Sequence, residues 1–73
     1  MLHRSTEITS GVHFYLWVGQ GINSNSVLLA NVLGGAQPHV LIDPGMTNGM
    51  VGEKPLESLV ATMNADGLRL EHV

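Results

Sequence analysis

Residues 12–18 read VHFYLWV, and this stretch decides what kind of fold the chain can adopt. Its β-branched and aromatic residues favour an extended backbone, so the stretch predicts a β-strand. Successive side chains of a strand point to opposite faces, and here both faces are bulky and largely apolar. We therefore expect a layer of structure on each side of this strand. The first face would carry Val12, Phe14, Leu16 and Val18, and the second His13, Tyr15 and Trp17.

Three further strands are predicted around this one. Residues 5–9 (STEIT) form a short strand, which the turn signal Ser10-Gly11 separates from the first. Residues 26–33 (SVLLANVL) follow a polar, glycine-rich loop and have two apolar faces. Residues 39–43 (HVLID) come after a second turn. Close connections of this kind favour an antiparallel sheet.

The period of the apolar residues changes after the loop of residues 44–52. Positions 56, 59, 60 and 63 are apolar at i, i+3, i+4 and i+7, which predicts an amphipathic helix. Pro55 suits the first turn of this helix, and Gly67 suits a left-handed C-cap. Residues 69–73 (RLEHV) then predict another strand.

The predicted order is therefore β-β-β-β-α-β, an α/β (α+β) fold with a mostly antiparallel sheet and one helix. A single helix covers only part of one face of such a sheet. We expect residues 1–73 to form a single incomplete domain, which amounts to half of a layered α/β/β/α sandwich.

The composition agrees with an incomplete domain. The chain has 73 residues, 44% of them hydrophobic and 12% charged, which is about half the usual charged share of roughly 25%. A chain this short has a marginal core, and so few charges cannot cover it with solvated surface. We expect much of its surface to face another chain or the missing part of the fold. The absence of cysteine excludes disulfides and thiolate metal sites.

The charge balance excludes some partners. The net charge is −3 with only three basic residues, so no basic patch exists for nucleic acid or an anionic membrane. The N-terminal residues MLHRSTEITSG lack the apolar core of a signal peptide. The apolar stretches are far shorter than the ~20 residues of a transmembrane helix. We expect a soluble, cytoplasmic protein.

Asp43 is the candidate functional residue, at the end of an apolar strand in VLIDPG (40–45). Pro44 favours an extended conformation at Asp43, so that the carboxylate projects from the strand end, where α/β sheets place ligands. The alternative is that Asp43 starts a turn by accepting hydrogen bonds from nearby N–H groups. The residues by themselves leave both interpretations open.

Other polar motifs favour structural roles. Gly19-Gln20-Gly21 resembles the start of a phosphate loop, but Ser24 replaces the third glycine and a strand follows. This segment is therefore expected to be a hairpin loop, which could act as a flap over a cleft. The four histidines lack the close spacing of a metal site and are expected to be structural or solvated, namely His3, His13, His39 and His72.

The order of these features resembles the N-terminal portion of the metallo-β-lactamase superfamily of metal-dependent hydrolases. In that family an apolar strand ends in Asp-x-Gly, and an amphipathic helix and a strand lead to the His-x-His-x-Asp-His metal motif. This chain ends before the position of that motif. The matching pieces are GVHFYLWVG (11–19), NSNSVLL (23–29), VLIDPG (40–45), PLESLVATM (55–63) and GLRLEHV (67–73).

The resemblance implies a hydrolase in which zinc or another divalent metal activates water for attack on an ester, thioester or amide-like bond of a small-molecule substrate. It assigns Asp43 an outer-shell role, orienting the metal-binding loop, and Gly45 the tight turn beside it. It places no catalytic residue and no metal ligand in residues 1–73, so this chain alone is expected to be inactive and to bind no cofactor. The rival hypothesis is a stand-alone β-meander-plus-helix module, whose exposed apolar faces drive homo-oligomerisation or partner binding.

Overall fold

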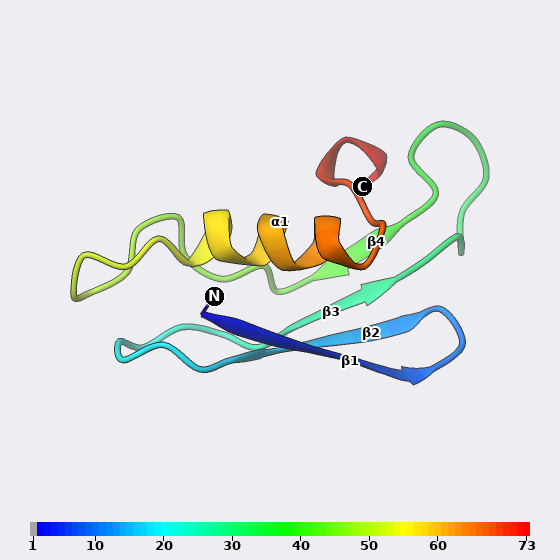
Figure 1. The fold of residues 1–73 in the computed structure, drawn as a ribbon. Helices are drawn as coiled ribbons and strands as arrows, with labels where there is room; N and C mark the ends of the chain where they lie inside the picture. The colour runs from blue at the N-terminus through cyan, green and yellow to red at the C-terminus, as the bar shows by residue number, and fades with distance from the viewer. Residues whose placement is uncertain (1) are drawn as a thin grey trace.

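The computed structural model describes residues 2–73 as a four-stranded antiparallel sheet with one α-helix on it (Figure 1). The strands follow the chain order β1-β2-β3-β4, and each pairs with its neighbour in antiparallel fashion. This arrangement confirms the predicted α+β fold of four strands followed by a helix. The elements are β1 (His3–Thr9), β2 (Val12–Trp17), β3 (Ser26–Leu29), β4 (Val40–Ile42), α1 (Pro55–Ala65) and the 3-10 helix η1 (Leu70–His72).

The predicted final strand is wrong, because residues 70–72 form the 3-10 helix η1 and pair with no strand. One backbone bond, from the His39 N–H to the His72 carbonyl at 3.1 Å, joins this segment to the start of β4. A single bond of this kind fixes the end of a segment but makes no ladder. The remaining bonds are local, such as Val73 N–H to the Leu70 carbonyl at 3.0 Å.

The strand β3 is shorter than the sequence pattern predicts, ending at Leu29 rather than at residue 33. Asn31 has a left-handed backbone with φ 58°, which turns the chain out of the sheet. Its N–H donates to Nδ1 of His39 at 3.0 Å, so a side chain takes the place of a ladder partner.

The helix α1 begins and ends as predicted. Pro55 occupies its first turn, where a missing N–H costs nothing. Gly67 adopts φ 78°, and the Leu68 N–H bonds to the Met63 carbonyl at 2.9 Å, which completes a Schellman cap together with Gly67 N–H to Asn64. The cap folds Leu68 back against the core. Within residues 2–73, no helix is long and apolar enough to cross a membrane.

The core lies between α1 and the face of the sheet that the helix covers. Tyr15 of β2 and Leu28 of β3 contribute from the sheet, and both are fully buried. Leu59 and Met63 contribute from the helix and are also fully buried. Each such side chain stabilises the fold by roughly 1.5–3 kcal/mol through the area it removes from water.

The other face of the sheet is apolar and carries no other element among the described residues (Figure 1). Phe14 pairs with Val27, and Val27 pairs with Ile42, so apolar side chains run across three strands. Ile42 remains 48% exposed at the end of this row. We call this surface the open face. It consists of Val12, Phe14, Val27, Leu29, Val40 and Ile42.

Candidate functional site

Asp43 follows the last residue of β4 and is exposed, with its backbone in the left-handed region at φ 55°. The expectation of an extended Asp43 is therefore wrong. The hydroxyl of Ser26 donates to the Asp43 carbonyl at 2.7 Å and so restrains the peptide group that follows Asp43. Aspartate tolerates this conformation better than most residues do. Left-handed non-glycine residues are uncommon and tend to gather at functional sites.

The turn after Asp43 is held by Asn23 and not by Asp43. The Met46 N–H donates to Oδ1 of Asn23 at 2.7 Å. Gly45 lies directly against this amide, since a Cβ at Gly45 would sit 2.5 Å from the same oxygen. Its φ of 84° also requires glycine. Asn23, and not Asp43, is therefore the side chain that accepts a backbone hydrogen bond in this turn.

The Asp43 carboxylate has no hydrogen-bond or ion-pair partner within residues 2–73. Aspartates in turns usually accept bonds from neighbouring N–H groups, and this one does not. The result is an exposed carboxylate at the end of the sheet, on a backbone fixed by Ser26.

A second acidic residue, Glu53, joins the loop of residues 44–54, which contains this turn, to the loop of residues 19–25. The N–H groups of Gln20 and Gly21 each donate to one Glu53 carboxylate oxygen, both at 2.8 Å. Glycine is needed at position 19, where a Cβ would lie 2.3 Å from the Trp17 ring and 2.7 Å from Glu53. The expected hairpin loop is confirmed, since this segment connects two antiparallel strands. Gly21 and Glu53 are 32 positions apart in the sequence, so no local pattern indicates this contact.

The buried histidines have structural surroundings. His3 is 4% exposed, its Nδ1 lies 2.9 Å from the Ser58 hydroxyl, and its ring packs edge-on against Trp17 with centroids 5.2 Å apart. Burial lowers the pKa of His3. His39 is 7% exposed and accepts a bond from Asn31. These contacts fit the expectation of structural histidines.

The residues present do not fit a resident metal ion. Within residues 2–73, no group of three or more histidine, cysteine, aspartate or glutamate side chains is close enough together to hold one. The nearest approach to a histidine pair joins His39 and His72, whose ring centroids are 6.1 Å apart. A zinc site needs at least three protein ligands.

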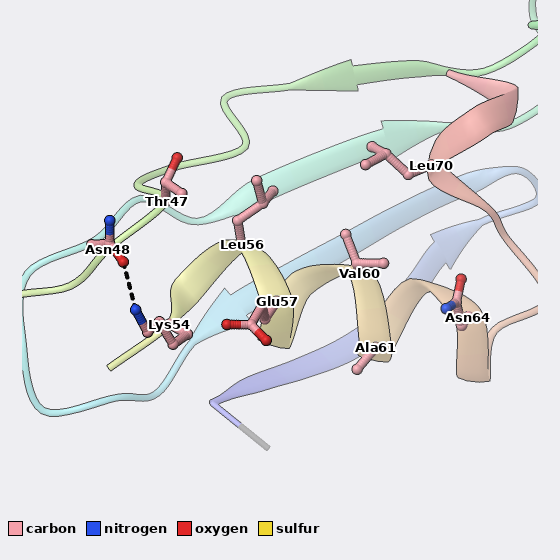
Figure 2. Close-up of a pocket in the computed structure, with 9 residues that line it drawn as sticks. All are labelled: Thr47, Asn48, Lys54, Leu56, Glu57, Val60, Ala61, Asn64 and Leu70. Atoms are coloured by element: carbon pink, nitrogen blue, oxygen red, sulfur yellow. Dashed lines mark hydrogen bonds between the residues drawn. The ribbon is translucent and has the colours of Figure 1, made fainter. Parts of the chain in front are cut away.

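A groove of about 560 Å³ lies along α1, beside the loop of residues 44–54 and η1 (Figure 2). Leu56 and Val60 project from one side of the helix, and Leu70 lies across the groove from them. Lys54 closes one end, where its ammonium donates to Oδ1 of Asn48 at 2.8 Å. This volume is within the range of roughly 300–1,000 Å³ that ligand sites have. Asp43 is not among the residues that line the groove.

Comparison with known proteins adds no relative to this picture. No family model, no curated protein and no solved structure matches the chain. The candidate site therefore rests on its own geometry and on the order of motifs in the sequence.

Proposed function

We propose that this chain supplies one helix-covered sheet of a zinc-type, metal-dependent hydrolase of the metallo-β-lactamase superfamily, acting on a small molecule. In this proposal Asp43 and Gly45 support the metal-binding loop, and the metal ligands come from another part of the intact enzyme. The 73-residue chain alone is inactive. The intact enzyme is cytoplasmic and has no nucleic-acid or membrane partner.

The exposed carboxylate of Asp43 is the observation that carries the proposal. It follows β4, its backbone is fixed by the Ser26 hydroxyl at 2.7 Å, and no described residue neutralises or bonds it. Outer-shell carboxylates in metal sites need this combination of a rigid backbone and an available oxygen, because they orient a ligand rather than bind the metal. A turn-forming aspartate would instead be bonded to its own loop.

The layering supports the same proposal. The helix α1 covers one face of the sheet, while the open face presents apolar side chains such as Phe14 and Val27. Two sheets that pack face to face bury such surfaces about 10 Å apart. A second sheet on the open face would complete the α/β/β/α sandwich that the resemblance implies.

The proposal is tested first by the gene. A closely spaced His/Asp cluster encoded shortly after Val73 supports the hydrolase, and a stop codon at that point contradicts it. The second test is metal content. The purified 73-residue chain should retain no stoichiometric zinc after dialysis. The intact protein should retain zinc and hydrolyse an ester or thioester until a chelator is added.

The open face favours a second candidate, a self-contained module that works by homo-oligomerisation or partner binding. Six apolar residues on three neighbouring strands make a continuous surface, and Ile42 is 48% exposed within it. Such patches mark association surfaces in soluble proteins. The two candidates differ in what covers this face, which is a second sheet of the same enzyme or another molecule.

A further inference from the structure

Two loops at the Asp43 end of the sheet are joined at two separate points. The first loop is residues 19–25 and the second is residues 44–54. Glu53 of the second loop accepts the backbone N–H groups of Gln20 and Gly21 in the first, each at 2.8 Å. Asn23 of the first loop accepts the N–H of Met46 in the second at 2.7 Å.

We propose that Glu53 is a positioning residue that sets the conformation of the turn at Asp43. Its carboxylate latches the first loop against the second, which places Asn23 where it can hold the turn. The role of this latch in an enzyme rests on the function proposed above, whereas its effect on the conformation of the turn does not.

Asn23 lies between two residues that Trp17 holds, Gly21 and Asn25, and the latch adds the attachment of this part of the first loop to the second. Trp17 anchors the base of this loop, since its Nε1–H donates to the Gly21 carbonyl at 2.7 Å and its backbone N–H donates to Asn25 at 2.9 Å. Within the described residues, Glu53 makes the hydrogen bonds that join the second loop to Gln20 and Gly21. Asn23 stands two residues beyond Gly21, so a displaced loop would move its amide away from Met46.

The turn at Asp43 is then fixed from two sides. Ser26 holds the Asp43 carbonyl from within the sheet, at 2.7 Å. Asn23 holds the Met46 N–H from the first loop and lies against Gly45, where a Cβ would come within 2.5 Å of it. Releasing the Asn23 side leaves the loop after Asp43 attached through the sheet and through the Met46 carbonyl, which accepts the Leu56 N–H at 3.1 Å.

The latch requires a carboxylate at position 53. Each of its oxygens faces an N–H group, and such charge-assisted bonds are about twice as strong as neutral ones. Glutamine has nearly the same shape, but its NH₂ group would face one of these N–H donors. Glu53→Gln therefore tests the chemistry of the latch with almost no change in volume. Glu57→Gln is the matched control, because Glu57 is exposed in the first turn of α1.

The experiment is amide NMR spectroscopy with hydrogen exchange on the intact chain. Glu53→Gln should raise the exchange rates of the Gln20 and Gly21 amides about tenfold. It should also shift the resonances of Gly45, Met46 and the Asn23 side-chain amide, while Glu57→Gln shifts none of them. Faster exchange at Gln20 and Gly21 with unchanged resonances at Gly45, Met46 and Asn23 would overturn the proposal, since the latch would then be purely local.

A second pair of variants keeps the test decisive if Glu53→Gln folds poorly. A Cβ at Gly21 would lie 3.1 Å from Oε1 of Glu53, so Gly21→Ala should push the carboxylate by a few tenths of an ångström and produce the same remote shifts. Gly34→Ala is its control, because a Cβ at Gly34 meets nothing within 4 Å. Remote shifts in an intact protein that shows no hydrolysis would support the latch and contradict only the proposed hydrolase function.

Discussion

The hydroxyl of Ser26 in β3 donates a hydrogen bond to the carbonyl of Asp43 at 2.7 Å. Ser26 is fully buried and lies 17 positions before Asp43 in the sequence. The bond restrains the carbonyl of a residue whose backbone is left-handed and whose side chain is exposed. It is thus the point where the core of the sheet determines the geometry of the candidate site.

Replacing this hydroxyl should weaken the fold and loosen the turn. Ser26→Ala should lower the free energy of unfolding by about 1 kcal/mol, the usual net value of one internal hydrogen bond. Urea denaturation measures the change. Ser24→Ala is the control, since the Ser24 hydroxyl makes no hydrogen bond within the described residues, and only the Ser24 carbonyl accepts one. Equal stability of Ser26→Ala and the unmodified chain would show that the bond contributes nothing.

Tyr15 should resist ionisation in the folded protein. Its ring is fully buried, and its hydroxyl donates to Asp66 at 2.9 Å. Burial raises its pKa, and the hydrogen bond and negative charge of Asp66 raise the pKa further. Stability from this group is complete below the unfolded pKa of roughly 10 and is lost as the pH rises toward the folded pKa.

The chain contains one tyrosine, so absorbance at high pH reports on Tyr15 alone. The folded protein should show no tyrosinate signal at pH values where the denatured chain has titrated. Tyr15→Phe should remove the alkaline loss of stability that this group causes and should lower stability at neutral pH by about 1 kcal/mol. A normal tyrosine titration in the folded protein would contradict the buried position.

His3 should make the fold sensitive to acid. Burial lowers its pKa, and its neighbours Ser58 and Trp17 offer no negative charge. The unfolded chain therefore takes up a proton at a higher pH than the folded chain does. The contribution of His3 is complete above its unfolded pKa of roughly 6.5 and is lost as the pH falls below that value.

Denaturation curves recorded across this range measure the effect. The loss of stability with falling pH should be smaller in His3→Gln than in the unmodified chain, because glutamine does not titrate. Comparing the two proteins cancels the titration of the other three histidines. Identical slopes of stability against pH would show that His3 is not protected from protonation.

The open face separates the two candidate functions. In the association module, Val27→Lys should dissociate an oligomer of the 73-residue chain, because a charge would replace the central side chain between Phe14 and Ile42. Ile22→Lys is the control, since Ile22 is 74% exposed in a loop. Sedimentation velocity measures the assembly. A chain that sediments as a monomer at micromolar concentration would remove the homo-oligomer from consideration.

Local sequence patterns were sufficient for the elements that depend on near neighbours. Alternation in VHFYLWV (12–18) predicted a strand, and the apolar spacing with Gly67 predicted the helix and its cap. The strand predicted at residues 69–73 does not form. An apolar pattern favours a strand but does not provide a pairing partner, and within the described residues β4 pairs with β3 alone.

The candidate site depended on contacts between distant residues, which no local pattern reveals. Pro44 favoured an extended Asp43, but Asp43 is left-handed and its carbonyl accepts a bond from Ser26 in another strand. The role of Gly19-Gln20-Gly21 depends on Glu53, which accepts the N–H groups of Gln20 and Gly21 from a distant part of the chain. The only signals of this contact in the sequence were the glycines at 19 and 21 and the acidic residue Glu53 ahead of the helix.

The zinc content of the intact protein carrying Asp43→Asn tests the central proposal most directly. Asparagine tolerates the same left-handed backbone and keeps the shape of the side chain, but it removes the charge. Loss of an outer-shell carboxylate typically lowers metal affinity about 10- to 100-fold. Asp43→Asn should therefore lose zinc on dialysis against a weak chelator, while Glu57→Gln retains it. Equal zinc content and equal hydrolysis in the two variants would contradict a supporting role for Asp43.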